Sequence, residues 1–353
     1  MELCDENVKW EEDPLEFVFN DEIPGQVRMH TKPLNMHDWI RIDRTYVQQM
    51  ELKERLLRTQ LNDVFITNQD DVTTQAKWEL FETLCAYLPE RFEYIFEKHS
   101  EYIFNKVTRE KISTQVSDNL DPLVRCGKLT QEDWILMKWD EEREEYVLTA
   151  GCVCFPMRWV LKEKLNHNIA QLHAPVKGFL KHLLSKVNSL LRNMKPDKPL
   201  TRGNWVLLND LKSPMDLYTP VNPKEVNKPS HYKGDLTGRE LIFRSEYQTL
   251  RKLPRSQCIA FSLRTYQRYL EEFQNFSDKD CRGLIDALES IDSDFHEYKA
   301  LFLWKDAAVM YLKSILACRA QNSSRQWVLY GTLISAGVAA AAAFLWYRTT
   351  LKR

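Results

Sequence analysis

Several motifs by which enzymes hold phosphate, zinc or a catalytic serine are missing from this sequence. Its 353 residues include ten glycines and contain no glycine-rich phosphate loop, His-Glu-x-x-His, Gly-x-Ser-x-Gly or paired Cys-x-x-Cys motif. These absences argue against a Rossmann dinucleotide enzyme, a zinc protease and an α/β-hydrolase. If the chain is an enzyme, we expect a cofactor to supply its chemistry.

An excess of charge of one sign is also lacking, since 49 basic residues face 50 acidic ones and the net charge is −1. This balance lacks the basic footprint of a nucleic-acid-binding protein, so no nucleic-acid partner is expected. The apolar content of 44% and the charged content of 28% are typical of a globular protein. Eight cysteines without a regular spacing predict reduced thiols in a cytosolic setting.

The N-terminus lacks a basic segment followed by an apolar one, so neither a secretory signal nor a transit peptide is expected there. It carries acidic residues instead, at positions 2, 5, 6, 11 and 12. We therefore expect an acidic N-terminal extension over residues 1–29, ahead of a globular domain over residues 30–318.

One apolar run, Trp327 to Tyr347, has the length needed to cross a bilayer. About twenty residues at about 1.5 Å each span the ~30 Å hydrocarbon core, and aromatic rings stand at both ends of the run. The run predicts a C-terminal transmembrane anchor, with a linker over 319–326 before it and a basic tail over 348–353 after it. Gly331 and Ser335 have the small-residue spacing that allows a homodimer.

The anchor predicts a location on a membrane, with the bulk of the chain in the cytosol. The short basic tail and the modestly apolar helix favour the mitochondrial outer membrane over the endoplasmic reticulum and the peroxisome.

The rest of the chain predicts an α+β fold with a mainly antiparallel sheet that carries helices. Helical segments are expected at Arg44–Leu61, Thr73–Leu88, Tyr94–Lys111 and Ala287–Cys318. Segments rich in β-forming residues predict strands at Glu145–Phe155, Asn204–Leu208, Glu240–Arg244 and Cys258–Leu263. Between the first two strands, apolar residues keep a helical period over Pro175–Arg192. Four prolines predict a loop insertion at Ser213–Gly238.

His173 lies just ahead of Pro175, the proline that opens the periodic helix. A proline suits the first turn of a helix because its missing N–H would have no partner there. The positive end of the helix dipole disfavours an imidazolium ion, so the ring is expected to stay neutral, the form that binds a metal. A packed or capping histidine has the same context, and both interpretations stay open.

A second candidate site lies on the strand around Arg244. With a strand period of two, Arg244, Glu246 and Gln248 point to one face of the sheet, where they could line a polar site. A solvated sheet face with an ordinary ion pair would have the same pattern. Similar clusters lie at Arg202-Gly-Asn-Trp205 and at Arg264-Thr-Tyr266.

Six segments in chain order resemble the family of the haem-dependent oxidative N-demethylase α subunit. They are Lys32-Pro-Leu-Asn-Met-His-Asp-Trp-Ile40, Leu129-Thr-Gln-Glu-Asp133, Ala150-Gly-Cys-Val-Cys-Phe-Pro-Met-Arg-Trp159, His173-Ala-Pro-Val176, Arg202-Gly-Asn-Trp205 and Gln248-Thr-Leu-Arg-Lys-Leu-Pro254. The chain departs from the family pattern at Lys177, Lys212 and Tyr247, and the last two departures put the substrate in question.

The resemblance implies a PAS-like sheet elaborated with helices, which holds haem b and activates oxygen to oxidise a small methylated amine. It also implies electrons from a separate reductase with flavin and iron–sulfur components. In this setting His173 is the candidate axial ligand of the iron. Arg202, Arg244 and Arg264 are the candidates to bind haem propionates, because a planar guanidinium matches a carboxylate.

The same resemblance gives candidate roles to the remaining polar and aromatic residues. Glu246 and Gln248 are candidate catalytic residues that orient an amine or bound oxygen. Tyr266, also a candidate catalytic residue, and Trp205, a candidate in the cofactor site, could contact an alkylammonium through their rings.

Two sets of alternatives stay open at this point. Thiolate ligation by Cys152 or Cys154 is the alternative to His173, although small buried core residues would show the same alternation. For the whole chain, a haem-dependent monooxygenase competes with a haem-binding sensor or carrier and with a haem-free, membrane-anchored adaptor.

Overall fold

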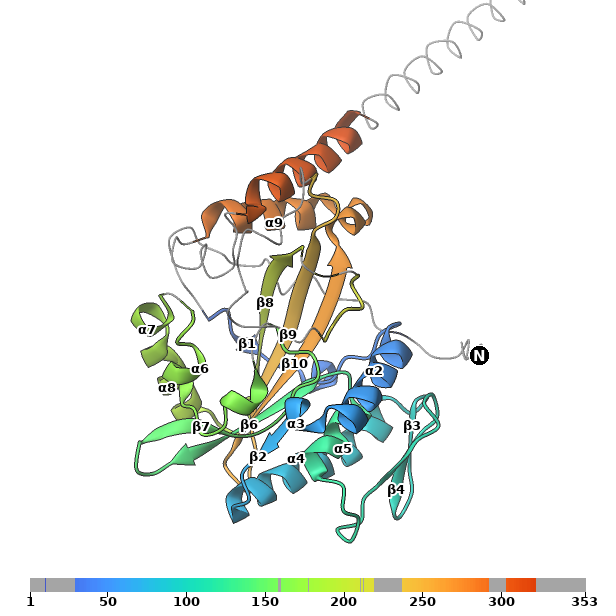
Figure 1. Cartoon of the computed structure of the whole chain (residues 1–353), viewed down its shortest axis with the longest axis vertical. Helices are drawn as coiled ribbons and strands as arrows, with labels where there is room; N and C mark the ends of the chain where they lie inside the picture. Colours follow the sequence, from blue (N-terminus) through green and yellow to red (C-terminus); the bar gives the residue numbers. More distant parts are fainter. Residues whose placement is uncertain are drawn as a thin grey trace, which may run out of the picture.

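A computed structural model describes residues 10, 29–157, 160–176, 178–209, 211, 213–218, 237–291 and 303–321. Its main element is a seven-stranded sheet, antiparallel throughout, with the strand order β1-β8-β9-β10-β6-β7-β2 (Figure 1). In that order the strands are Lys32–Pro33, Leu200–Leu208, Ile242–Lys252, Ile259–Tyr269, Asp133–Asp140, Glu145–Cys152 and Phe65–Thr67. A smaller antiparallel sheet contains β3 (Phe96–Lys98), β4 (Tyr102–Asn105) and β5 (Lys111–Ser113).

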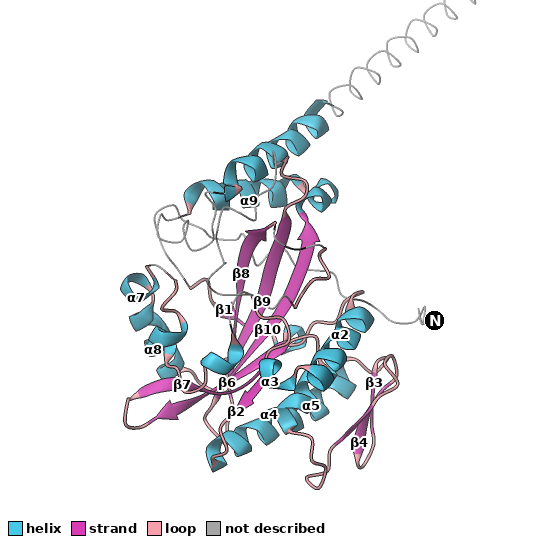
Figure 2. Cartoon of the chain, viewed as in Figure 1, coloured by secondary structure: helices cyan, strands magenta, loops and turns pink. Residues whose placement is uncertain are grey.

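Helices cover both faces of the large sheet (Figures 1 and 2). One face, called here the α4 face, packs against α2 (Tyr46–Thr59), α4 (Asp71–Arg91) and α5 (Pro122–Leu129). The opposite face, called the α8 face, packs against α6 (Ile169–Leu172), α7 (Phe179–His182) and α8 (Leu184–Asn193). The short α3 (Leu61–Val64) precedes β2, and α9 (Asp278–Ser290) lies with helix 305–321 against one end of β8 and β9.

The two faces follow from the alternation of side chains along each strand. On β6, Trp134 and Leu136 belong to the core under α2, α4 and α5, whereas Ile135 and Met137 belong to the core under α8. Successive side chains of a strand point to opposite faces, so each strand here supplies apolar groups to two separate cores.

Helix α2 carries polar residues on its buried stripe. Its buried positions recur at spacings of three and four residues, as expected for one face of a helix, and are Tyr46, Gln49, Met50, Lys53, Leu56 and Leu57. Gln49 and Lys53 therefore enter the core together with the apolar residues, and they take part in the polar contacts described below.

The helix predicted over Tyr94–Lys111 is wrong, because this segment contains β3 and β4. On β4 the buried residues Ile103 and Asn105 alternate with the partly buried Tyr102 and Phe104, which is the period of a strand. The side chain of Asn105 also accepts the N–H groups of the next turn, at 3.0 and 3.1 Å. Pairing with neighbouring strands decides the structure of this segment.

The single helix predicted over Pro175–Arg192 is also corrected. Helical structure begins only at Phe179, after Gly178, whose φ of 77° lies in the left-handed region that glycine tolerates. Leu183 then separates α7 from α8, and Leu180 is exposed, although it keeps the helical period. The period identified the apolar stripe that packs on the sheet, but it did not reveal the two interruptions.

The helix predicted over Ala287–Cys318 is divided as well. Helix α9 starts earlier, at Asp278, and ends at Ser290, because Ile291 has extended backbone angles. A second helix covers residues 305–321, and residues 292–302 lie outside the described part of the chain.

The predicted fold class is corrected at its C-terminal element. The described residues form a mixture of helices and antiparallel sheet, and none of their helices is both long and apolar enough to cross a membrane. The transmembrane helix is therefore removed from the fold assignment. Residues 327–347, on which that prediction rested, lie outside the described residues.

Candidate functional site

Four polar side chains form a hydrogen-bonded row on the α8 face, and this set is called the polar row. Arg202 Nη1 donates to Gln248 Oε1 at 2.5 Å, and Gln248 Nε2 donates to Glu246 Oε2 at 2.9 Å. Glu246 Oε1 forms an ion pair with Arg244 Nη2 at 3.1 Å. The row runs along β9 and begins on the neighbouring strand β8.

Strand register explains why these side chains meet. Arg202 of β8 lies opposite Gln248 of β9, and two residues further along Asn204 lies opposite Glu246. Residues of β9 at intervals of two share one face, as the sequence predicted for Arg244, Glu246 and Gln248. The same face continues into Leu250, which packs in the core under α8.

Arg244 is held at one end of the row by acceptors from three directions. Its Nη2 donates to the carbonyl of Phe155 at 2.8 Å and to Thr265 Oγ1 at 3.2 Å, and its Nη1 donates to Gln267 Oε1 at 3.1 Å. Together with Glu246, these contacts fix the guanidinium. The partners leave little of its hydrogen-bonding capacity for a ligand.

Arg202 is held less completely at the other end of the row. Its Nε donates to the carbonyl of Met29 at 3.0 Å, and its Nη1 donates to Gln248, whereas Nη2 has no hydrogen-bond partner among the described residues. Burial lowers the pKa of this guanidinium, and the carboxylate of Glu246 opposes that effect. A free N–H group on a half-buried arginine is a suitable contact for a carboxylate or another anion.

His173 lies directly after the four residues of α6, at their C-terminal end. Its Nδ1 is 2.9 Å from the carbonyl of Ile169, and since a carbonyl only accepts, Nδ1 carries the proton. Its ring stacks on Phe179, with the centroids 4.0 Å apart. The unprotonated Nε2 has no partner among the described residues, and this is the arrangement in which histidines bind metals.

Burial is the main reason why the His173 pKa is lowered, and the charge of Arg202 adds to it, while the Ile169 carbonyl opposes it. The ring is therefore neutral near pH 7, as the sequence predicted. The predicted reason was wrong, however, because His173 follows the C-terminus of α6 and does not precede the N-terminus of a helix. Desolvation and Arg202 keep the ring neutral here.

The other three predicted site residues point to the opposite side of the sheet. Trp205 is buried close to Phe243 in the core below α9. Tyr266 is buried in the core under α4, and the guanidinium of Arg264 lies 4.4 Å from its ring centre. The structure thus places His173 within the electrostatic influence of Arg202, a member of the polar row. Trp205, Tyr266 and Arg264 lie on the other side of the sheet.

Arg264 is fully buried and bound by protein groups. Its Nη2 pairs with Asp43 at 2.7 Å, its Nη1 donates to Gln49 Oε1 at 2.9 Å, and its Nε donates to the carbonyl of Arg41 at 3.2 Å. The pKa of Asp43 is lowered: burial raises it, but Arg264 and hydrogen bonds from Thr45 outweigh that effect. These contacts join β10 to the segment that leads into α2.

Cys152, the last residue of β7, and Cys154, two residues beyond it, are both fully buried in the core under α4, whereas Val153 packs in the core under α8. The predicted alternation is present, although the strand ends before Cys154. The thiol of Cys152 and burial raise the pKa of Cys154 well above its ordinary value, which favours the protonated thiol over a thiolate. Both side chains lie away from the core that contains Phe179, on which His173 stacks.

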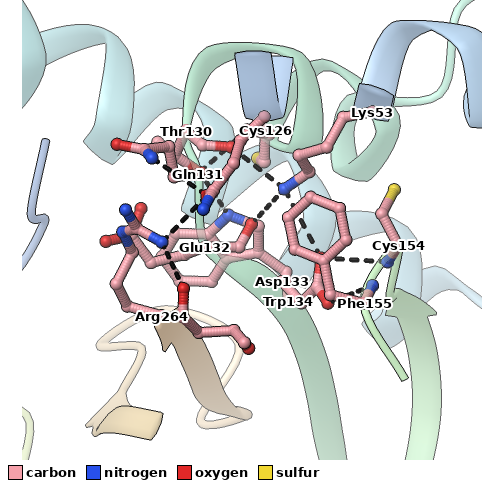
Figure 3. Close-up of polar contacts among 12 residues, drawn as sticks. Lys53, Cys126, Thr130, Gln131, Glu132, Asp133, Trp134, Cys154, Phe155 and Arg264 are labelled. Atoms are coloured by element: carbon pink, nitrogen blue, oxygen red, sulfur yellow. Dashed lines mark hydrogen bonds and ion pairs between the residues drawn. The ribbon is translucent and has the colours of Figure 1, made fainter. Parts of the chain in front are cut away.

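A buried ionic cluster between α2 and the start of β6 was missed by the sequence analysis, and Figure 3 shows it. Lys53 Nζ donates to the carbonyls of Thr130 and Glu132, at 3.0 and 2.5 Å, and lies 3.5 Å from Asp133 Oδ1. Asp133 accepts the N–H groups of Cys154 and Phe155 at 2.9 and 2.7 Å. The sequence did contain one sign of this cluster, because Lys53 lies on the apolar stripe of the helix predicted over Arg44–Leu61.

Glu132 is the least satisfied member of this cluster. Its Oε1 accepts the N–H of Arg41 at 2.9 Å, but Oε2 is buried and has no hydrogen-bond partner among the described residues. Burial raises the pKa of Glu132 to about 7, although Arg264, the Arg41 N–H and Lys53 oppose the rise. A carboxyl group in this setting titrates near neutral pH.

His173 and the polar row, with Arg202 at its end, suit a cofactor that takes one nitrogen ligand and carries carboxylates. Haem needs a single axial side chain from the protein, and the neutral Nε2 of His173 has that chemistry. Arg202 Nη2 can pair with a carboxylate of the same group. Among the described residues, no group of three or more His, Cys, Asp or Glu side chains gathers as a metal site of the all-protein kind.

Comparison with protein families gives a match over most of the chain. The family model described as haem-dependent oxidative N-demethylase, alpha subunit-like, matches residues 30–309. The match includes α2, the whole large sheet, His173 and the polar row. The chain therefore belongs to the haem-dependent oxidative N-demethylase, alpha subunit-like family.

Proposed function

We propose that this protein is a haem b-dependent monooxygenase that removes a methyl group from a small methylated amine. The observation that supports this proposal best is the neutral His173, whose Nε2 has no partner in the described part of the chain and whose ring lies within the electrostatic influence of Arg202. The family name supplies the dependence on haem and the reaction class. The products would be the demethylated amine and formaldehyde.

In this proposal the residues of the chain bind and orient, and bound haem supplies the activation of oxygen. His173 Nε2 would hold the iron, with the Ile169 carbonyl fixing the tautomer and the ring of Phe179 fixing its plane. Arg202 Nη2 would pair with a propionate. Gln248, which already accepts from Arg202, would keep that guanidinium in place.

Glu246 is the proposed contact for the amine, because it is the carboxylate of the polar row. Its Oε1 is paired with Arg244, and its Oε2 accepts from Gln248. Oε2 also accepts from Asn204 Nδ2, but at 3.5 Å, the limit of hydrogen-bond distance, and an N–H of an alkylammonium ion would replace that long contact. Arg244 would then keep the Glu246 carboxyl group aimed along the row.

The family name describes an alpha subunit, which supports a separate electron-delivering component as partner. We propose that this component is a reductase with flavin and iron–sulfur centres. The chain itself has none of the sequence motifs that would bind such centres.

A haem-binding sensor or carrier is the second candidate function. Both oxygens of Glu246 already accept from protein groups, so the polar row is complete without an amine. Such a protein would need only His173 and Arg202. Turnover of an amine separates this function from the first.

Haem titration of the full-length chain, followed by the Soret band, tests the ligand assignment. We expect His173→Ala to weaken haem binding by at least about tenfold, because losing a ligand costs no less than losing its outer-shell partner. His182→Ala, on the neighbouring α7, serves as the matched control and is expected to bind haem like the wild type. If wild type and His173→Ala bind equally well, His173 is not the ligand.

Formaldehyde release tests the reaction. The haem-loaded protein, supplied with oxygen and a chemical or protein reductant, is expected to release formaldehyde from at least one member of a panel of methylated amines. A haem-loaded protein that releases none would favour the sensor or carrier.

A further inference from the structure

We propose that Asp133 is a positioning residue for the polar row, and that it acts through the main chain of Phe155 on Arg244. The described contacts form a continuous path from Lys53 through Asp133 and Phe155 to Arg244 and Glu246. The consequence for an amine substrate rests on the proposed function, whereas the structural coupling does not.

Asp133 binds a turn of the main chain with both of its carboxylate oxygens. Oδ1 accepts the N–H of Cys154 at 2.9 Å, and Oδ2 accepts the N–H of Phe155 at 2.7 Å. The side chain is nearly inaccessible to solvent, with Lys53 as its counter-ion (Figure 3). A buried carboxylate with two N–H donors and an ammonium group is held in one geometry.

Phe155 passes this constraint to the polar row, because its other main-chain polar group faces Arg244. The Phe155 carbonyl accepts from Arg244 Nη2 at 2.8 Å, and the same Nη2 donates to Glu246 Oε1 at 3.1 Å. Arg244 Nη2 thus donates both to the turn at Phe155 and to Glu246, the proposed contact for the amine. A shift of the turn would move the point to which Arg244 is bound, and Glu246 with it.

The register of the sheet places Asp133 close to the row. Asp133 opens β6 and pairs with Leu263 of β10, which in turn pairs with Gln248 of β9. Burial raises the pKa of Asp133, and the charges of Lys53 and Arg244 are among the effects that oppose this rise. The path through Phe155 therefore links β6 to β9, which lie on the two sides of β10.

Glu79 provides a matched control, because it makes the same kind of contact elsewhere. It is a buried carboxylate whose two oxygens accept two successive main-chain N–H groups, of Arg255 at 2.7 Å and of Ser256 at 2.8 Å. The turn that it holds joins β9 to β10 and has no described contact with Arg244. Removing either carboxylate costs comparable hydrogen bonds, but only Asp133 leads to the polar row.

A double-mutant cycle on the full-length chain tests the coupling. An asparagine at position 133 keeps one acceptor oxygen, so one N–H of the turn loses its partner. We expect Asp133→Asn and Arg244→Gln to be non-additive by at least about fivefold in the unfolding equilibrium constant. Glu79→Gln with Arg244→Gln is expected to be additive within about twofold. Additivity of the Asp133 cycle would overturn the proposal.

Asp133→Glu separates positioning from charge. Glutamate keeps the charge but moves the carboxylate by one methylene group, so the two hydrogen bonds to the turn change. If Asp133 acts by positioning the turn, the Asp133→Glu cycle with Arg244→Gln should be as non-additive as the Asp133→Asn cycle. If Asp133→Glu behaves like the wild type instead, charge alone couples the two residues and the proposal is wrong.

Hydrogen exchange gives a measurement that does not require a folded Asp133 variant. Arg244→Gln removes the contact on the Phe155 carbonyl, so we expect the Phe155 N–H to exchange at least about fivefold faster. The N–H of Ser256, held by Glu79, is expected to exchange as in the wild type. Equal rates for Phe155 in the two proteins would overturn the proposal.

Amine turnover, where it is observed, tests the functional consequence. We expect Asp133→Asn to raise KM for the amine several-fold while haem binding stays as in the wild type, and Glu79→Gln to change neither. A wild type without haem binding or turnover would contradict the proposed function, whereas the coupling and exchange measurements would still decide the role of Asp133.

Discussion

Replacing Lys53 by methionine is expected to lower the free energy of unfolding by about 3–5 kcal/mol, the usual cost of removing one partner of a buried ion pair. Lys53 is fully buried, and its three N–H groups have three acceptors: two main-chain carbonyls and Asp133. Methionine fills similar space but donates nothing, so both carbonyls and the carboxylate lose a buried partner. Denaturant unfolding of the two proteins measures the difference.

Lys313→Met is the matched exchange on the surface. Lys313 pairs with Glu289 at 2.8 Å, but both side chains are exposed, at 58% and 47%. Exposed pairs contribute about 0–1 kcal/mol, so this variant is expected to unfold nearly as the wild type does. A loss of less than about 1 kcal/mol in Lys53→Met would show that the buried cluster does not stabilise the fold as described.

Replacing Glu132 by glutamine is expected to change how stability depends on pH. The pKa of Glu132 is about 7 in the folded protein, against an ordinary value of 4.5. Between these values the folded protein binds a proton that the unfolded chain does not, so the wild type loses stability as pH rises from about 4.5 to about 7. The difference between the two pKa values corresponds to a loss of unfolding free energy on the order of 3 kcal/mol over this pH range. The glutamine variant does not titrate here and is not expected to show this loss.

Unfolding curves measured from pH 4.5 to pH 8 test this prediction. The Glu132→Gln variant is expected to gain stability relative to the wild type across this range, because glutamine stays neutral and keeps an oxygen for the Arg41 N–H. The same exchange at the exposed Glu289 should leave the pH dependence of the wild type as it is. Parallel curves for wild type and Glu132→Gln would contradict a raised pKa at this site.

The sequence predicted the parts of the fold that depend on local periodicity. The four strands with β-forming residues are present as β7, β8, β9 and β10, although each observed strand has different ends. The period of two placed Arg244, Glu246 and Gln248 on one face, and the order of the family motifs identified the family. Alternation is a property of a single strand, so it can be read without the rest of the molecule.

The secondary structure predicted from local patterns was wrong in segments whose conformation depends on contacts with neighbouring segments. The segment around β4 forms a strand because β3 and β5 pair with it, and the periodic stretch after His173 is interrupted at Gly178 and at Leu183. Helical period and β-forming residues are weak preferences, which pairing and packing override. The segments that were predicted wrongly are short and rely on such contacts.

By itself, the sequence determined the family, the main strands and the residues that share the face of the polar row. Only the tertiary structure decided that, among the residues it describes, Arg202 keeps an N–H group without a partner while Arg264 is enclosed by protein partners, and that Lys53 and Glu132 are buried. The reason is that burial and hydrogen-bond partners come from segments far apart in the chain. Lys53 meets a carbonyl 77 residues away, and Arg264 pairs with a carboxylate 221 residues away. No local pattern in the sequence predicts contacts between residues so far apart. These contacts determine the charge of each group and whether it can bind a ligand.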